Sequence, residues 1–247
     1  MTKKRLDLIL VDRGYFKSRA KAQAALMAGK VEIDGKPAPK PGTHLREDVK
    51  IDVIPDAVPF VSRGGIKLDA ALHNFAIDVR DRTALDVGAS TGGFTDCLLQ
   101  RGAKQVFAVD VGRGQIDQSL RDDPRVVSLE RTHARDLTPE VLGGAAPDIA
   151  VVDVSFISLT KVLAPVFACL QKPFEAVVLI KPQFELEPKK APKGVVRTEE
   201  FRKEAVARVR AALKELPVEE KGFLESPIKG PKGNVEFLLY LKSVCPG

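Results

Sequence analysis

The chain has 247 residues, 44% of them hydrophobic, which is enough for a substantial core and argues against wholesale disorder. Its apolar runs fall short of the ~20 residues that span a bilayer, and its first residues lack the long apolar core of a signal peptide. Three widely spaced cysteines argue against a disulfide framework and favour a reducing cytoplasm. No His/Cys cluster has the spacing of metal ligands, so no metal is expected.

The net charge is +6, and its position in the chain is informative. Residues 1–40 contain ten Lys/Arg and only four Asp/Glu, so they carry the whole surplus. The 29 basic and 29 acidic residues of the remainder balance. Such asymmetry favours a module that binds a polyanion, although charge alone fits a solvated surface about equally well.

The first module is expected to run to about residue 54. Two short helices are predicted, over 6–13 and 18–28, with Ser18 as the N-cap of the second. Strands are predicted over 31–38, with a turn at Asp34-Gly35, and over 49–54. Prolines and glycines then indicate a linker. The predicted division is a module over 1–58, a linker over 59–63 and a second domain over 64–247.

From residue 64 onward, the pattern alternates between helix and strand. Helices are predicted over 64–75, 91–102 and 198–216. Strands are predicted over 83–88, 104–111, 126–130, 147–156, 174–182 and 234–242. This alternation predicts an α/β fold whose mostly parallel sheet has helices on both faces.

The segment LDVGASTGGFTD, residues 85–96, combines a strand end, a glycine-containing turn and a helix start. Glycines let the backbone pass close to a ligand, and ligands of such sheets bind at the carboxyl ends of the strands. The spacing differs from GxGxxG, which disfavours NAD. Asp110 ends the next strand, where a carboxylate can accept both hydroxyls of a ribose.

Asp136 follows the strand after that. It is a candidate acceptor for an adenine amino proton and, with equal weight, a loop or helix-cap residue. The predicted cofactor-binding residues are Asp86, Gly88, Ala89, Ser90, Thr91, Gly92, Gly93, Asp110 and Asp136.

The series of motifs resembles the Rossmann-like S-adenosylmethionine-dependent methyltransferases. Residues 60–242 resemble the FtsJ/RrmJ group, which methylates ribose 2′-hydroxyls of RNA, and residues 5–42 resemble the alpha-L RNA-binding motif. Nearly the whole chain resembles the TlyA family, whose members are described as rRNA cytidine 2′-O-methyltransferases and, historically, as haemolysins. The matching phrases are SRGGIKLDAAL, LDVGASTGGFTD, VVDVSFIS, LIKPQFE and GNVEFLLYL.

The resemblance implies S-adenosyl-L-methionine as cofactor and ribosomal RNA or ribosomal subunits as partner. It leaves open the nucleotide, the subunit and the oligomeric state. The lysine-rich loop over 185–198 departs from the family pattern, so its RNA contacts stay open. The helix dipole and basic side chains at the start of the second helix favour phosphate. The predicted RNA-binding residues are Lys4, Arg5, Arg13, Arg19 and Lys21.

Four residues match the Lys-Asp-Lys-Glu tetrad of the FtsJ-like group, and the resemblance makes them catalytic: Lys67, Asp153, Lys181 and Glu236. The strand pattern agrees, because Asp153 and Lys181 end the fourth and fifth parallel strands and reach the edge of the cofactor turn. Glu236 lies in the final strand, and Lys67 lies on the helix before the sheet.

The chemistry explains this mixture of charges. A methyl sulfonium is a strong electrophile, so the enzyme must mainly position and activate the hydroxyl. A lysine serves as the base only if its pKa is lowered toward neutrality. Burial and a second lysine favour this, whereas two carboxylates oppose it but orient the amine. The alternative for Lys181 is a lysine that snorkels at a strand end.

Three other functional classes compete with an RNA methyltransferase. A membrane-active haemolysin is disfavoured because there is no spanning segment and no long helix with an apolar face and basic rim. A non-catalytic RNA-binding assembly factor would not need the tetrad or the cofactor residues. An NAD-linked dehydrogenase is disfavoured by the glycine spacing and is separable by direct cofactor titration.

Overall fold

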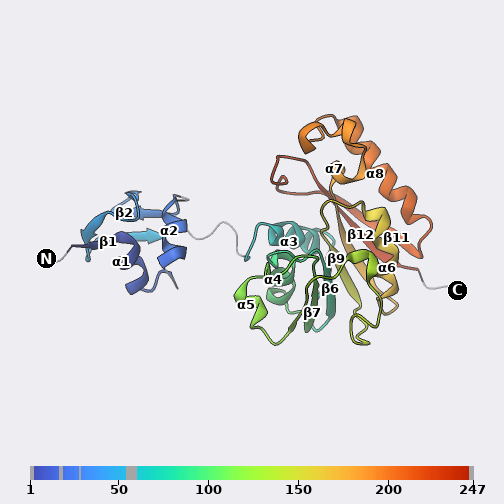
Figure 1. Cartoon of the computed structure of the whole chain (residues 1–247), viewed down its shortest axis with the longest axis horizontal. Coiled ribbons are helices and arrows are strands. Elements are labelled where there is room, and N and C mark those ends of the chain that lie inside the picture. The colour runs from blue at the N-terminus through green and yellow to red at the C-terminus, as the bar shows by residue number, and fades with distance from the viewer. Residues whose placement is uncertain (1–2, 17–18, 28, 54–59, 245–247) are drawn as a thin grey trace. The chain divides into compact units, whose positions relative to one another are not determined.

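The computed structural model describes residues 3–16, 19–27, 29–53 and 60–244. The chain forms two compact units, Met1–Pro59 and Phe60–Gly247 (Figure 1). The described part of the predicted linker, residues 60–63, belongs to the second unit. There the backbone N–H of Val61 donates to Asp96 at 2.7 Å.

The first unit contains two helices and two small sheets. The predicted helices are confirmed as α1 (Leu6–Asp12) and α2 (Arg19–Met27), and the predicted N-cap Ser18 lies outside the described residues. One sheet has the order β3 (Lys36–Pro37), β2 (Val31–Ile33), β5 (Ile51–Val53). The predicted Asp34-Gly35 turn joins β2 to β3, and both residues have positive φ, 51° and 75°. A second, unpredicted ribbon pairs β1 (Lys3–Arg5) with β4 (His44–Arg46).

The core of the first unit comes from the apolar faces of its helices and strands. Leu6, Ile9 and Leu10 of α1 pack with residues of α2, β2 and β5. The other buried members are Ala22, Ala25, Leu26, Val31 and Ile51. The spacing of the α1 residues, predicted to be helical, places all three inside.

One carboxylate is fully buried beside this core. Asp7 accepts two hydrogen bonds from Arg5, at 3.0 and 2.9 Å, and one each from Arg19 at 2.9 Å and Gln23 at 2.6 Å. The Arg5 hydrogen bonds, with those of Gln23 and Arg19, hold the pKa of Asp7 well below its ordinary value. A buried carboxylate is tolerated because cations and hydrogen bonds satisfy it. Asp7 thereby ties α1 to α2.

We predict that Asp7→Asn lowers the stability of the first unit by about 2 kcal/mol, because charge-assisted hydrogen bonds are lost. Since the folded pKa of Asp7 is depressed, its contribution is present above the unfolded pKa of about 3.9 and is lost as pH falls below about 4. Amide hydrogen exchange of α1 in the full chain measures both effects. The control is Asp48→Asn, which removes an exposed partner of Arg46 and should change little. Equal losses in both variants would contradict the role of Asp7.

The second unit is built on a seven-stranded sheet of order β11-β12-β10-β9-β6-β7-β8. Five strands are parallel: β6 (Thr83–Val87), β7 (Gln105–Val109), β8 (Val126–Leu129), β9 (Ile149–Val152) and β10 (Glu175–Ile180). Two follow in antiparallel pairing: β12 (Phe237–Ser243) with β10, and β11 (Val218–Glu225) with β12. The predicted mostly parallel α/β sheet is confirmed.

Helices cover both faces of this sheet (Figure 1). On one face lie α3 (Gly64–Asn74) and α4 (Gly93–Gln100), together with α5 (Gln118–Arg121). On the other lie α6 (Leu163–Ala168) and α8 (Glu199–Leu213). A short helix, α7 (Pro182–Glu185), follows β10 directly. Single 3₁₀ turns are η1 (Ala134–Asp136), η2 (Leu159–Lys161), η3 (Pro188–Lys190) and η4 (Pro192–Gly194).

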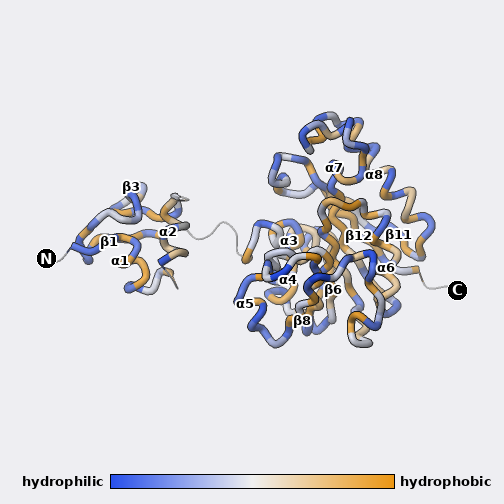
Figure 2. Tube along the Cα trace, viewed as in Figure 1, coloured by the Kyte–Doolittle hydropathy of each residue, from blue (hydrophilic) through white to orange (hydrophobic). Residues whose placement is uncertain are grey.

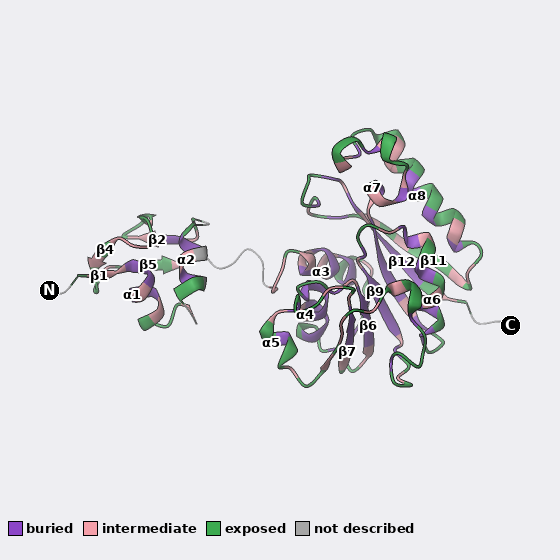
Figure 3. Cartoon of the chain, in the orientation of Figure 1, coloured by how far each residue is buried: buried purple, intermediate pink, exposed green. Residues whose placement is uncertain are grey.

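Two apolar cores result, one on each face of the sheet. Figure 2 shows hydrophobic residues concentrated in the central strands, and Figure 3 shows the same strands as buried. All four residues of β9 are buried, as are five of the six in β10. Strands with both faces covered read as continuous apolar runs, which is why they were predictable. No helix of the described residues is long and apolar enough to cross a membrane.

Candidate active site

The carboxyl ends of β6, β9 and β10 open into two adjoining cavities of about 730 and 1040 Å³. The segments that follow β6, β9 and β10 line both of them. The shared lining residues are Gly88, Ser90, Asp153, Ser155, Phe156, Gln183 and Phe184. The location agrees with the rule that parallel α/β sheets bind ligands beyond the carboxyl ends of their strands.

The glycine turn after β6 passes close to neighbouring backbone and side chains. Gly88 has φ 88°, and a Cβ there would lie 2.5 Å from the carbonyl oxygen of Asp153. A Cβ on Gly93 would lie 2.1 Å from Ser62 Oγ. Asp110 braces the turn by accepting from the N–H of Ser90 at 2.8 Å and of Gly112 at 2.7 Å.

Six of the nine predicted cofactor-binding residues line a cavity: Gly88, Ala89, Ser90, Thr91, Gly93 and Asp110. Gly92 is the N-cap of α4 and lines neither cavity. Asp86 is fully buried and accepts from Thr95 Oγ1 at 2.6 Å, and burial raises its pKa to about 7. It therefore supports the turn from below and lines neither cavity. Asp136 is exposed in η1, outside both cavities, whereas its neighbours His133 and Arg135 line the second.

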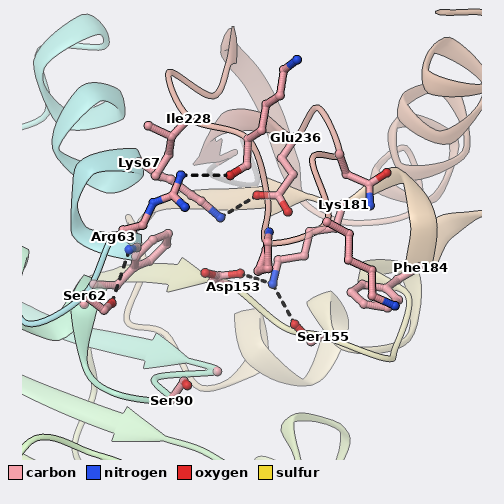
Figure 4. A pocket seen from close by; sticks show the side chains of 18 of the residues that line it. Ser62, Arg63, Lys67, Ser90, Asp153, Ser155, Lys181, Phe184, Ile228 and Glu236 are labelled. Atoms are coloured by element: carbon pink, nitrogen blue, oxygen red, sulfur yellow. Dashed lines mark hydrogen bonds and ion pairs between the residues drawn. The ribbon is translucent and has the colours of Figure 1, made fainter. Parts of the chain in front are cut away.

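The four tetrad residues all line the first cavity, where they form two ion pairs (Figure 4). Lys67 of α3 reaches Glu236, just before β12, with 2.5 Å between Nζ and Oε2. Lys181, at the end of β10, lies 2.5 Å from Asp153 Oδ1. The side chains are 9% exposed for Lys67, 1% for Glu236, 11% for Lys181 and 18% for Asp153. Two cations and two anions are thus removed from most of the solvent as neutral pairs.

The amine of Lys181 has a further partner. Its Nζ donates to Ser155 Oγ at 2.8 Å, and Figure 4 shows it between Asp153 and Ser155. The fully buried carboxylate end of Glu236 is accommodated because residue 230 is glycine: a Cβ there would lie 2.3 Å from Glu236 Oε1. The structure therefore presents both ion pairs at the wall of the first cavity, with Glu236 the most buried of the four residues.

Sequence reasoning did not identify the aromatic residues of the site. Phe156 is 91% exposed, although it follows a buried strand, and its φ of 64° is rare for a bulky residue. Its ring lies 5.1 Å from that of Phe184, centroid to centroid. The phrases VVDVSFIS and LIKPQFE contain both residues. The signal available for Phe156 was its position just after the polar residues Asp153 and Ser155 at the end of a strand.

Basic side chains surround the mouths of the cavities. Arg63, Lys229 and Lys232 line the first, and Arg135, Lys161 and Arg208 line the second. Within the described part of the chain, none of these six forms an ion pair with a carboxylate, whereas most other cations of this unit do. The small net charge of this unit, with 27 Lys/Arg and 25 Asp/Glu, therefore conceals a basic rim around the cavities.

The predicted RNA-binding residues of the first unit have intramolecular partners. Arg5 and Arg19 bind Asp7, and Lys4 pairs with Asp12. Arg13 donates to the carbonyl of Val49 at 2.7 Å. The side chains of Lys4, Arg5 and Arg19 remain 39%, 35% and 51% exposed, so solvent-facing donors are left. The side chain of Lys21 lies outside the described residues.

Comparison with known proteins places this site in a family. Residues 60–243 match the FtsJ-like methyltransferase family, and residues 4–51 match the S4 domain. A Mycobacterium tuberculosis protein named 16S/23S rRNA (cytidine-2'-O)-methyltransferase TlyA is 48% identical, covering 97% of this chain and 90% of its own length. Hemolysin A of Brachyspira hyodysenteriae is 40% identical, covering 96% of this chain and 98% of its own.

A solved structure from Streptococcus thermophilus, which carries a provisional hemolysin name, superposes with a TM-score of 0.76 at 38% identity. The match covers 99% of this chain and 90% of that one. The relatives thus share both units of the chain and their order. The chain belongs to the TlyA family of FtsJ-like methyltransferases, with an S4 domain in front of the catalytic unit.

Proposed function

We propose that the protein transfers the methyl group of S-adenosylmethionine to the 2′-hydroxyl of a cytidine in ribosomal RNA. The observation that carries the proposal is the Lys181 amine, which lies at the cavity wall beside Asp153, with the Lys67–Glu236 pair lining the same cavity. The Mycobacterium tuberculosis relative is named for this reaction. Ribosomal RNA is found in the cytoplasm, so the enzyme is proposed to act there.

The side chains at the site fit the methyl donor. The turn over residues 88–93 passes close to β9 and to residue 62, and side chains at Gly88 or Gly93 would fill that space. Asp110 uses each carboxylate oxygen once for a backbone N–H, and a carboxylate can accept more hydrogen bonds than these two. In the proposal, Asp110 holds the ribose hydroxyls of the donor and the backbone of the turn holds its amino-acid end.

The bound donor supplies an electrophilic methyl group on a sulfonium. The chain's own contribution is to place the ribose hydroxyl in line and to remove its proton. Lys181, in its neutral form, accepts that proton and becomes an ammonium beside Asp153. The Lys67–Glu236 pair fixes the back of the cavity, and its two charges cancel, which leaves Asp153 to balance the new ammonium.

Ribosomal RNA is the proposed partner of both units. Residues 1–40, in the first unit, carry a charge surplus equal to that of the whole chain, and the second unit presents six cations around its cavities. The exposed ring of Phe156 lines the same cavity as the tetrad. It provides a surface on which an unstacked RNA base can lie. Recognition of a single target nucleotide in structured RNA requires such contacts.

The cofactor assignment is tested by Asp110→Ala. Loss of the proposed pair of charge-assisted hydrogen bonds should weaken S-adenosylmethionine binding by about 2–4 kcal/mol. Isothermal titration of the full chain measures this, and circular dichroism confirms that the variant is folded. Asp136→Ala is the matched control, because this exposed residue lies outside both cavities and should bind normally. Wild-type affinity in Asp110→Ala would refute the assignment.

The RNA assignment is tested by removing residues 1–57. The shortened chain should keep its affinity for S-adenosylmethionine, which shows that the second unit is intact, and should lose most of its affinity for ribosomal subunits. Binding by the full chain should weaken steeply with salt, since phosphate contacts release counterions. Filter binding over a salt series measures both. Equal binding and methylation by the two chains would mean that the S4 domain serves another purpose.

The role of Lys181 is tested by alanine and arginine. Without the base, single-turnover methyl transfer at saturating RNA and cofactor should fall roughly 10²-fold or more, with little change in either affinity. Arginine should not restore the rate, because its guanidinium stays protonated.

A lysine that only holds charge or grips RNA would behave differently. Arginine would then preserve most of the rate, since it keeps the positive charge and the hydrogen bonds. A near-normal single-turnover rate in Lys181→Arg would therefore exclude the base and return Lys181 to a structural role.

A further inference from the structure

Lys181 Nζ has an ion-pair partner inside the tetrad, Asp153, and a hydrogen-bond acceptor outside it, Ser155. Asp153 Oδ1 lies 2.5 Å from Nζ, and Ser155 Oγ lies 2.8 Å from it. Ser155 is exposed and lines both cavities. Ser155 therefore lies where the ribose hydroxyl of the RNA and the general base, Lys181, must meet.

The hydrogen bond to Ser155 restricts the direction of the lone pair on Lys181, because a neutral amine has few hydrogens. A neutral primary amine has two N–H groups and one lone pair. If Ser155 accepts one N–H and the other faces its ion-pair partner Asp153, the lone pair is left in the one remaining direction. With Asp153 alone, the amine rotates about its Cε–Nζ bond, and the lone pair samples directions in which it cannot accept the proton.

We infer that Ser155 is a positioning residue for Lys181: its hydroxyl oxygen takes one N–H and thereby directs the lone pair at the ribose hydroxyl. The inference deepens the proposed function and rests on it. The step balances. The O2′–H bond breaks, and its proton forms the third N–H of Lys181. The freed oxygen pair forms the O–CH₃ bond, and the pair of the broken C–S bond stays on sulfur.

The loop that carries Ser155 is held firmly enough for this role. Glu185, 2% exposed, accepts from Ser158 Oγ at 2.5 Å and from the N–H of Leu159 at 2.9 Å. Phe156 keeps its positive φ in this loop and contacts Phe184. A strained residue persists only where its surroundings determine the conformation.

The short helix α7 connects Lys181, the general base, to the loop that carries Ser155. Lys181 precedes α7 directly, and Glu185 is the last residue of that helix. The segment that delivers the amine therefore also fixes the loop that delivers Ser155. The contacts of Glu185 with Ser158 and Leu159 thereby help to set the distance between Lys181 Nζ and Ser155 Oγ.

The test is a double-mutant cycle in the full chain, with ribosomal subunits and S-adenosylmethionine as probes. Ser155→Ala should slow single-turnover methyl transfer about 10-fold and leave both dissociation constants within about two-fold. Ser155→Thr should retain most of the rate, because it keeps the hydroxyl. Ser119→Ala removes an exposed hydroxyl on α5 and is the matched control.

The cycle separates positioning from other roles. If Ser155 acts through Lys181, Ser155→Ala has no further effect in the Lys181→Arg background. The same 10-fold loss in both backgrounds would overturn the inference. So would a near-normal rate in Ser155→Ala, or a loss that appears in RNA affinity with the rate unchanged.

A second readout is independent of RNA. The ¹H–¹⁵N signal of the Lys181 ammonium, assigned by its absence in Lys181→Arg, reports its hydrogen bonds. Ser155→Ala should speed exchange of those protons with water several-fold, and Ser119→Ala should not. An unchanged signal would overturn the inference even if the enzyme proved inactive on ribosomal RNA. Absence of ribose methylation by the wild type would instead overturn the proposed function.

Discussion

The ion pair between Lys181 and Asp153 depends on one topological constraint, which is that parallel strands end at the same edge of a sheet. β9 and β10 are adjacent and parallel, so the residues that follow them meet without a long loop. The pair could not persist as isolated charges in a largely buried site, because desolvation of either partner alone costs several kcal/mol. Together with Lys67 and Glu236 it forms a neutral set of four charges. This neutrality permits lysines and carboxylates together at largely buried positions.

Much of this arrangement was predictable, because it follows from strand ends. Asp153 and Lys181 each close an apolar run, and the convergence of those ends is a property of any parallel sheet. The turn at 88–93 was predictable for a similar reason, since glycines at a strand–helix junction indicate close backbone approach. The apolar runs of β9 and β10 were clear because both faces of these strands are covered.

The remainder depends on contacts that the order of residues does not contain. β11 has charged residues at Glu219, Glu220, Lys221 and Glu225, so it lacked the apolar alternation of a strand, yet it pairs as the exposed edge. Asp86 belongs to the predicted cofactor motif but is buried and accepts a hydrogen bond from Thr95. The second partner of Lys181 could not be found from sequence, because Ser155 is one of several hydroxyl residues and only the fold selects it.

The net charge of a segment, likewise, predicts only part of its role. The surplus in residues 1–40 indicated a polyanion-binding module, and an S4 domain matches that segment. Yet Arg5 and Arg19 also hold the buried Asp7, so their charge serves the fold as well as the surface. The second unit nearly balances its charges in number, with 27 basic and 25 acidic residues, but not in space, because its cations without carboxylate partners include the six around the cavities. Net charge counts residues, whereas binding depends on which of them keep their donors free.

The central claim is that this site methylates a ribose hydroxyl of ribosomal RNA. The most direct test is a map of ribose-methylated nucleotides in ribosomal RNA from cells with the gene, without it, and with it supplied again. At least one 2′-O-methylcytidine is expected to disappear with the gene and to return when the gene is restored. Identical maps in all three strains, from cells in which the protein is expressed, would contradict it.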